Sequence, residues 1–327
     1  MNYDKLLDEF KDKRILVIGD VMLDAYILGN VTRVSPEAPV PVVSLNKKEN
    51  RIGGAGNVAL NLKNLGAQPI IASVIGQDSE GDILEDLFFK RGISTDGLIK
   101  SNHRKTTVKT RVISSKQQLL RIDSEDTFPI SSELNEDMFS KIRELVHNKI
   151  DAIIIEDYDK GLLNKKNIES IIAVAKANNI PVAADPKREN FHYYKGLSLF
   201  KPNLKELKEG LNRAFSFETE NEQFSDAVNE LRIAIPHTIS LITLSEHGVF
   251  ICNDNESAHI TAHKREIADV SGAGDTVIAV ATLCLLANAS IKDIAQISNI
   301  AGGMVCEKPG VVSISLDELK DEVRELL

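Results

Sequence analysis

The sequence predicts an α/β protein with a doubly wound, mostly parallel central sheet flanked by helices, and with a small additional β-sheet. Three observations support this fold class. Apolar runs typical of strands alternate with segments of helical periodicity along most of the chain, as expected when helices connect parallel strands. Polar residues follow directly after several of these runs, and two glycine-rich stretches stand directly before helical segments.

The first elements form the start of the sheet. Residues 3–12 have the spacing of a short amphipathic helix, and residues 14–20 form an apolar run with β-branched residues, typical of a buried parallel strand. Asp20 ends this strand, at the sheet edge where α/β proteins bind ligands. We therefore predict that Asp20 binds a polyhydroxylated substrate. Alternatively, its carboxylate only accepts hydrogen bonds from N–H groups of the turn.

Two pairs of strand-like runs then interrupt the alternation. The predicted strands are 26–28, 40–45, 105–113 and 117–122. The prolines between the first two indicate an edge strand or an excursion from the main sheet. We predict that segments 24–47 and 104–123 form one small β-sheet lid, inserted in a single domain that covers residues 1–327. Two unrelated surface hairpins are the alternative, because strand pairing cannot be read from sequence.

A glycine-rich stretch lies between the two lid segments and precedes a predicted helix. Its Gly53 and Gly54 allow a ligand to approach the backbone, and Asn57 offers both a donor and an acceptor to sugar hydroxyls. The spacing is not that of the dinucleotide-binding fingerprint. Close packing of the helix would also explain the glycines.

The remaining chain alternates regularly. Strands are predicted at 69–75, 151–156, 181–185, 197–200, 238–243 and 248–252, and helices at 79–91, 132–147 and 165–178. Polar clusters follow four of these strands, at 157–161, 185–188, 201–206 and 243–248. Because parallel strands end at the same edge of a sheet, these clusters indicate one shared site.

Several residues of these clusters are candidates for binding a nucleotide and a metal. Asn203 and Glu206 are three residues apart at a helix start, so both can order the water shell of Mg²⁺, which takes few protein ligands. The same spacing is that of a capping box. Lys187 can neutralise phosphate or can simply be a solvated lysine. The candidates for cofactor binding are Asn203, Glu206, Thr243, Ser245 and Gly248.

The stretch 268–276 is the centre of the predicted site. Its Gly272, Ala273 and Gly274 precede an apolar run, 277–287, with the character of a buried helix. Unpaired N–H groups and the helix dipole at such a turn bind anions. Asp275 on the rim of this site repels phosphate, but it can act as the general base that takes a proton from a hydroxyl during phosphoryl transfer. An ordinary turn with an acidic residue at a helix start is the alternative.

Composition excludes several classes of function. A net charge of −9 argues against sequence-independent binding of nucleic acid. The N-terminus is charged where a signal peptide is apolar, and the longest apolar run, about a dozen residues, is too short to span a membrane. The three cysteines show no paired spacing. We expect a soluble cytoplasmic protein that binds small molecules.

Taken together, these residues resemble the ribokinase-like (PfkB) family of carbohydrate kinases. Residues 53–57 and 269–275 resemble its two signatures, and Asn203-Leu204-Lys205-Glu206 resembles its Asn-x-x-Glu motif. Other stretches are closer to one branch, the D-glycero-β-D-manno-heptose 7-phosphate kinases. These stretches are 19–24, 33–42, 117–123, 157–161 and 185–187.

The resemblance implies ATP-dependent phosphorylation of the C1 hydroxyl of the heptose 7-phosphate, which gives the 1,7-bisphosphate on the route to ADP-heptose, a precursor of the lipopolysaccharide core. ATP and Mg²⁺ are the implied cofactors. Asp20, Gly54 and Asn57 would hold the sugar, with Gly53 beside them. The candidate cations for the 7-phosphate are Arg33, Arg111 and Lys187. Family resemblance also implies a homodimer formed through the lid.

Three features differ from close relatives. Many of them carry a C-terminal nucleotidyltransferase domain with a His-x-Gly-His motif, which this sequence lacks, so we expect only the kinase activity. Val270 and Ser271 replace the Thr-Thr or Thr-Ser of many sugar kinases. Pro309 and Val311 stand where relatives have small or hydroxylated residues beside a monovalent cation, so K⁺ is a further candidate cofactor whose site differs here.

Two other functions fit the same sequence. One is another sugar kinase of this family, acting on ribose, fructose or a keto-deoxy sugar acid. The other is a catalytically silent regulator that binds sugar or nucleotide on a kinase fold. Asp275, Asn203 and Glu206, which are all present, argue against loss of catalysis, and a turnover assay separates the two classes.

Overall fold

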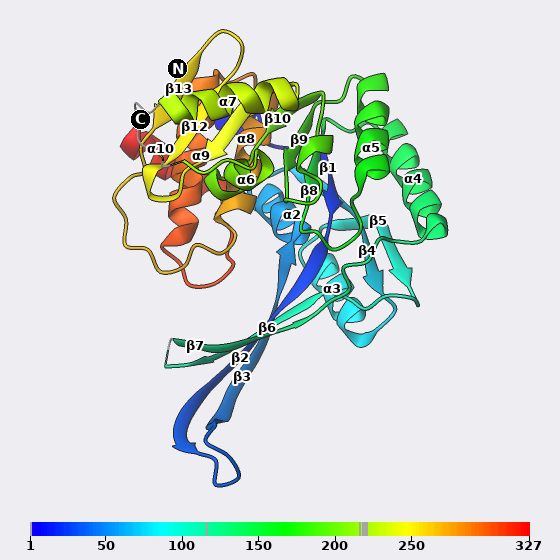
Figure 1. Cartoon of the computed structure of the whole chain (residues 1–327), viewed down its shortest axis with the longest axis vertical. Coiled ribbons are helices and arrows are strands. Elements are labelled where there is room, and N and C mark those ends of the chain that lie inside the picture. Colours follow the sequence, from blue (N-terminus) through cyan, green and yellow to red (C-terminus); the bar gives the residue numbers. More distant parts are fainter. Residues whose placement is uncertain (1, 116, 216, 218–221) are drawn as a thin grey trace.

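A nine-stranded sheet with helices on both faces forms the body of the protein (Figure 1). The computed structural model describes residues 2–115, 117–215, 217 and 222–327. The strand order is β13-β12-β11-β10-β9-β8-β1-β4-β5, and all neighbours are parallel except β11-β12 and β12-β13. The predicted fold class is therefore confirmed.

The strands of the sheet lie close to the predicted runs. They are β1 (Arg14–Gly19), β4 (Gln68–Gly76), β5 (Ser94–Ser101), β8 (Ala152–Glu156), β9 (Val182–Asp185), β10 (Leu197–Phe200), β11 (His237–Thr243), β12 (Val249–Cys252) and β13 (Ser257–Ile260). The edge strands β5 and β13 were not predicted. Both are rich in polar residues, because an edge strand has one neighbour and is less covered than the central strands.

Ten helices are present in the described part of the chain. They are α1 (Tyr3–Asp8), α2 (Ala55–Asn64), α3 (Ser79–Lys90), α4 (Ser132–His147), α5 (Lys165–Ala177), α6 (Leu204–Gly210), α7 (Glu222–Ala234), α8 (Ala273–Leu286), α9 (Ile291–Cys306) and α10 (Leu316–Leu326). Alternate residues of each central strand face opposite layers. Thus Val17 and Ile154 pack with α2, α8 and α9, whereas Ile18 and Ile155 pack with α4 and α5.

Helix α8 is buried along nearly its whole length. Residues Asp275 to Cys284 are all inaccessible to solvent or nearly so, because α8 lies between the sheet, α2 and α9. A helix that is apolar on every side needs such an enclosed position. Its N-terminus is consequently fixed at the C-terminal edge of the sheet, where β8 and β9 end.

The second sheet has four strands in the order β3-β2-β6-β7. They are β2 (Val21–Val34), β3 (Pro41–Gly54), β6 (Val108–Ser114) and β7 (Gln117–Ser124). A parallel pairing of β2 with β6 joins the two lid segments predicted from the sequence. The two strand pairs therefore form one sheet and are not unrelated hairpins. Lys116, in the predicted turn between the last two strands, lies outside the described residues. We call these four strands the lid.

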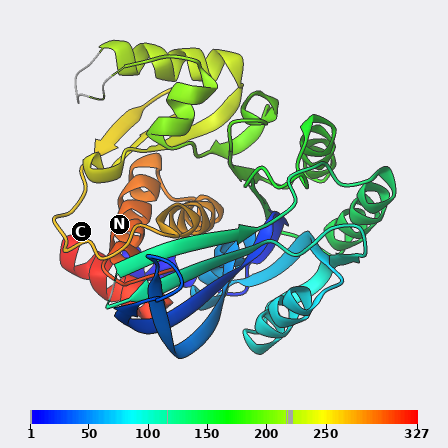
Figure 2. The ribbon, with the colours of Figure 1, turned by 60° about the horizontal axis from the view of Figure 1, so that its bottom comes forward.

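The prediction of short strands in the first lid segment was wrong. Strands β2 and β3 have 14 residues each, and they project far from the body (Figure 1). In Figure 2 the lid comes forward and is seen in front of the body. Their outer halves are exposed on both faces, so no clean alternation of apolar and polar residues marks them in the sequence. Proline at the start of β3 is tolerated because β3 is an edge strand.

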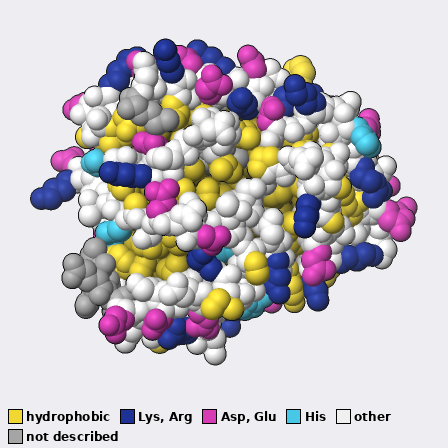
Figure 3. All heavy atoms as spheres, turned by 90° about the horizontal axis from the view of Figure 1, so that it is seen from above, with side chains coloured by type: hydrophobic (Ala, Val, Ile, Leu, Met, Phe, Trp, Pro, Cys, Tyr) yellow, Lys and Arg dark blue, Asp and Glu magenta, His cyan; other side chains and the backbone are white. Residues whose placement is uncertain are grey.

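The end of the body opposite the lid carries lysine, arginine, aspartate and glutamate side chains intermixed around apolar patches (Figure 3). The two termini lie together, where Arg324 contacts Asp4 at 3.0 Å and Lys320 contacts Asp8 at 2.8 Å. Among the helices of the described residues, none is both long and apolar enough to cross a membrane.

Candidate active site

Asp275 lies in the first turn of α8 and is clamped by two donors from distant segments. The Asn57 amide donates to its Oδ2 at 2.7 Å, and the Tyr158 hydroxyl donates to its Oδ1 at 2.8 Å. Asn57 is in the first turn of α2, and Tyr158 is in the loop after β8. Both glycine-rich stretches and one polar cluster of the sequence therefore meet at one carboxylate.

The pKa of Asp275 is raised, chiefly because the carboxyl is buried. The two hydrogen bonds act in the opposite direction, since they stabilise the charged form. A buried carboxylate with a raised pKa, held at a fixed orientation, has the properties of a general base. Asp275 and Asn57 are site residues predicted from the sequence, whereas no role was predicted for Tyr158.

The turn before α8 needs a glycine at position 272. Gly272 has φ +82°, and a Cβ there would lie 2.7 Å from the Asn57 amide nitrogen. The Ala273 N–H bonds weakly to the Val270 carbonyl at 3.3 Å. Within the described residues, the N–H groups of Gly272 and Gly274 have no hydrogen-bond partner. These two groups can therefore bind an anion beside Asp275.

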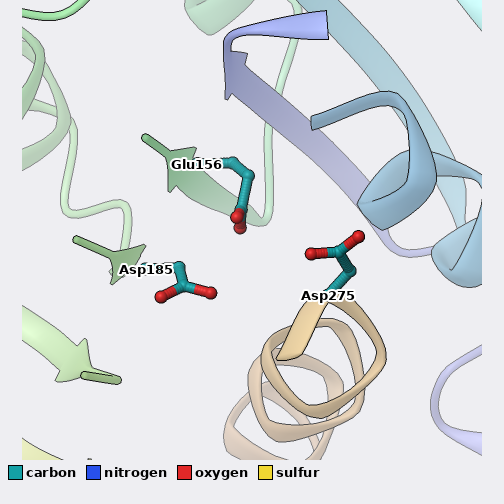
Figure 4. A group of neighbouring side chains, drawn as sticks. All are labelled: Glu156, Asp185 and Asp275. Atoms are coloured by element: carbon teal, nitrogen blue, oxygen red, sulfur yellow. The ribbon is translucent and has the colours of Figure 1, made fainter. Parts of the chain in front are cut away.

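Two further carboxylates face Asp275 across the end of the sheet (Figure 4). Glu156 and Asp185 are the last residues of β8 and β9, and an oxygen of each lies within 4.8 Å of the others and of Asp275. In the described structure, both Glu156 oxygens and Asp185 Oδ1 have no hydrogen-bond partner. Burial, followed by Asp185 and Asp275, raises the pKa of Glu156 well above its usual value. Buried carboxylate oxygens without partners fit a hard divalent cation such as Mg²⁺.

Glu156 was missed as a site residue, although the sequence offered a signal. It is the only charged residue in the strand Ala-Ile-Ile-Ile-Glu, and a glutamate is almost never fully buried without a partner. Lys201 was also not singled out. It is buried and contacts Asp185 Oδ2 at 2.7 Å, which partly balances the charge of the cluster.

Asn203 and Glu206 form the capping box that the sequence also allowed. Glu206 Oε2 accepts from the Asn203 N–H at 2.8 Å, and Glu206 Oε1 contacts Lys187 at 2.6 Å. Lys187 is thus an ion-paired residue in this structure and not a solvated lysine. The role of Asn203 and Glu206 in ordering hydrated Mg²⁺ stays a prediction.

The predicted sugar-binding residues lie at the root of the lid. One oxygen of Asp20 accepts from the N–H groups of Tyr158 and Lys160 at 3.0 and 3.2 Å, as in the alternative role considered above. Burial and the nearby Asp157 raise the pKa of Asp20 to about 6. Gly54 has φ +61°, and a Cβ on Gly53 would lie 2.2 Å from the Asp24 carboxylate. Close packing therefore explains why positions 53 and 54 are both glycine. That Asp20 and these glycines bind a sugar stays a prediction.

The three candidate cations for a sugar phosphate are not brought together. Arg111 pairs with Asp24 near the body, and Lys187 pairs with Glu206. Arg33 is exposed near the outer end of β2, nine residues beyond Asp24, which is roughly 30 Å at the rise of a strand.

A cavity of about 1000 Å³ lies beside the N-terminus of α8. The predicted nucleotide residues Asn203, Thr243, Ser245 and Gly248 line it, together with Ala273 and Gly274. Gly248 has φ +86°, and a Cβ there would collide with the Ile260 carbonyl oxygen at 2.0 Å. The cavity is large enough for a nucleotide, and its lining reaches the anion-binding turn.

Sequence comparison finds relatives across nearly the whole chain. It is 40% identical over 310 residues to the bifunctional protein HldE of Methylobacillus flagellatus, which covers 95% of this chain and 63% of that relative. It is 39% identical over 309 residues to the D-beta-D-heptose 7-phosphate kinase of Bordetella bronchiseptica, which covers 94% of this chain and 96% of the relative. The chain thus spans somewhat less than two thirds of the bifunctional relative.

Structural comparison and family comparison agree with the resemblance seen in the motifs. The fold is similar to phosphofructokinase-2 from Escherichia coli in complex with potassium, with a TM-score of 0.80 and 17% identity over 96% of this chain and 99% of that one. It is also similar to Arabidopsis thaliana ribokinase complexed with ribose and ATP, with a TM-score of 0.72, 17% identity and the same coverage. Residues 12–318 match the pfkB family carbohydrate kinases. The predicted resemblance is confirmed, and the chain belongs to the pfkB family of carbohydrate kinases.

Proposed function

We propose that this protein transfers a phosphoryl group from ATP to the C1 hydroxyl of D-glycero-β-D-manno-heptose 7-phosphate. The product is the 1,7-bisphosphate, on the route to ADP-heptose and the lipopolysaccharide core. The observation that carries the proposal is Asp275, clamped by Asn57 and Tyr158 at a helix start beside a nucleotide-sized cavity. The names of the two relatives supply the substrate. Because the reaction consumes ATP, we infer that it takes place in the cytoplasm.

Each part of the site has one task in the proposed reaction. Asp275 takes the proton of the sugar hydroxyl as the hydroxyl oxygen attacks the γ-phosphorus of ATP, and the bond from that phosphorus to the β–γ bridging oxygen breaks, which releases ADP. The free N–H groups of Gly272 and Gly274 stabilise the negative charge on the transferred group, with the N-terminal dipole of α8 behind them. Asn57 and Tyr158 keep the carboxylate of Asp275 oriented. The lid excludes water, which would otherwise compete as acceptor.

Mg²⁺, when bound, neutralises the phosphate charge of ATP. Glu156 and Asp185 have the free oxygens to hold such an ion directly, and Asn203 and Glu206 would order its water shell. K⁺ remains a candidate cofactor near residues 309–311. There, Asp269 accepts from the N–H groups of Ser271 and Gly310 at 2.9 and 3.0 Å, which joins this loop to the α8 turn.

The substrate assignment is tested with a panel of sugars. We expect turnover with D-glycero-β-D-manno-heptose 7-phosphate to exceed that with ribose, fructose and keto-deoxy sugar acids, measured by coupled ADP release. NMR of the product should show the new phosphate on C1. Preference for another sugar would identify a different carbohydrate kinase, and no turnover with any sugar would favour the silent regulator.

Replacing Asp275 by Asn tests the general base. Because the amide keeps the shape but cannot accept the proton, we expect kcat to fall by about 10²- to 10⁴-fold. ATP binding, followed by calorimetry, should change little. Asp254→Asn is a matched control, since this carboxylate is exposed, pairs with Arg232, and neither residue lines the cavity. Near-normal turnover by a folded Asp275→Asn protein would refute the assignment.

Replacing Tyr158 by Phe tests whether the Tyr158 hydroxyl lowers the pKa of Asp275. Asp275 must be ionised to accept a proton, so kcat/KM falls as the pH drops through its pKa. The Tyr158 hydrogen bond lowers this pKa, so its loss raises the pKa further. We therefore expect the acid limb of the pH profile to move to higher pH in Tyr158→Phe. An unchanged acid limb would show that Asp275 does not control it.

We also propose a homodimer formed through the lid. Its exposed apolar side chains are Val31, Val34, Val40, Leu45, Leu119, Leu120 and Ile122, between 36% and 63% accessible. Such an apolar surface on a projecting sheet is typical of a protein interface. Light scattering should give twice the chain mass of 36.0 kDa, and Leu120→Asp should yield monomer. Phe89→Asp, an exposed position on α3, is the control; a wild-type monomer would contradict the proposal.

A further inference from the structure

The lid presents a row of charged side chains on the face that carries Asp24. Strand pairing places Lys109 beside Asp24 and Asp123, and Arg111 beside Tyr26 and Arg121. Because side chains alternate along a strand, Lys109 and Arg111 point to the same face. The Arg111–Asp24 ion pair and the stacking of Arg111 on Tyr26, at 5.5 Å, are on this face near the body.

Most cations that the structure describes around the site have a carboxylate partner; Arg104, which has none, donates to the backbone carbonyls of Asp126 and Lys160. In the lid, Arg111 pairs with Asp24, Arg121 with Asp123 at 2.9 Å, and Arg51 with Glu49 at 2.7 Å. In the body, Lys160 pairs with Glu125 at 2.8 Å, Lys187 with Glu206 at 2.6 Å, and Lys201 with Asp185 at 2.7 Å. These pairs leave little free positive charge for a dianionic phosphate.

Lys109 is different. It is half-buried, and within the described chain its ammonium makes no ion pair. Its ammonium lies against the ring of Tyr158, 5.8 Å from the ring centroid. Burial, with a further contribution from the Lys160 ammonium, lowers the pKa of Lys109. Glu125 and Asp123 lie near enough to offset part of this effect, but neither forms an ion pair with Lys109. A partly buried ammonium outside any ion pair is unfavourable, and an anionic ligand would relieve that cost.

The position of Lys109 relates it directly to the site of reaction. The same Tyr158 whose ring contacts Lys109 donates its hydroxyl to Asp275 at 2.8 Å. Lys109 is therefore one aromatic ring away from the base, on the side of the lid. A sugar that has its reacting hydroxyl at Asp275 and its far end against the lid would bring that end near this ammonium.

We propose that Lys109 binds the phosphate monoester at the far end of the sugar substrate. This inference rests on the proposed kinase function and adds to it the residue that selects a phosphorylated sugar. A lysine ammonium is a compact point charge that suits phosphate. Arg33, Arg111 and Lys187, the cations identified from sequence, are too distant or are already paired. Since Lys109 belongs to the lid, the bound phosphate would also hold the lid against the body.

The test compares a phosphorylated sugar with its unphosphorylated form. In Lys109→Met, which keeps the side-chain length but removes the charge, we expect kcat/KM for the heptose 7-phosphate to fall roughly 10- to 100-fold. The value for the free heptose should change by less than about twofold, and Lys109→Arg should restore part of the loss. Lys48→Met is the matched control, because Lys48 is an exposed lid lysine that pairs with Ile27, on the other face.

Each outcome decides the inference. Equal losses for both sugars would show that Lys109 only positions Tyr158, and an unchanged Lys109→Met protein would exclude any role. If the wild type prefers another sugar, the proposed substrate fails, and the same comparison is made with that sugar and its phosphate ester. If no sugar is turned over, calorimetry with heptose 7-phosphate replaces kinetics. Binding that is weakened by Lys109→Met then supports the inference, and binding that is unchanged or absent overturns it.

Discussion

The site depends on one buried carboxylate whose two oxygens are held by donors of the protein. Asp275 is 6% exposed, and each of its oxygens accepts a hydrogen bond from a different part of the chain. Removing either donor would leave a desolvated charge unsatisfied, which is costly. Helix α2, the loop after β8 and helix α8 must therefore keep fixed relative positions. The central sheet provides them, because all three elements begin at its C-terminal edge.

Charge around Asp275 is not balanced by the protein alone. Glu156, Asp185, Glu206 and Asp275 are gathered there, whereas Lys187 and Lys201 are the ammonium groups that pair with this cluster. Four carboxylates facing two ammonium groups must either bind protons or bind a cation. The raised pKa of Glu156 favours binding of a proton, and a divalent ion would balance the same negative charge instead. A site that needs a metal for charge balance is suited to binding a nucleotide together with its metal.

The sequence predicted the features that depend on local patterns. The strands of the sheet follow from apolar runs, and Asp275 and Asn57 follow from glycine-rich stretches before helices. Features that depend on pairing between distant segments were not accessible. Tyr158 belongs to the site because its hydroxyl donates to Asp275, which is distant in sequence. Lys109 stands out because the neighbouring cations Arg111 and Arg121 already have carboxylate partners. Likewise, Arg33 looked suitable by charge, but the length of β2 places it far from Asp24.

The connection between lid and base is unusually short. Strand β3 ends at Gly54 and α2 starts at Ala55, with Asn57 in its first turn. The Ala55 N–H also bonds to the Asp20 carbonyl at 3.0 Å, where β1 passes into β2. No loop separates the lid from the residue that orients Asp275, so a displacement of the lid strands acts directly on the Asn57–Asp275 hydrogen bond. Substrate contacts made by the lid and the orientation of the base are therefore mechanically linked. At this link, Asp24 and the Asp20 carbonyl approach Gly53 and Gly54 too closely for either residue to carry a side chain.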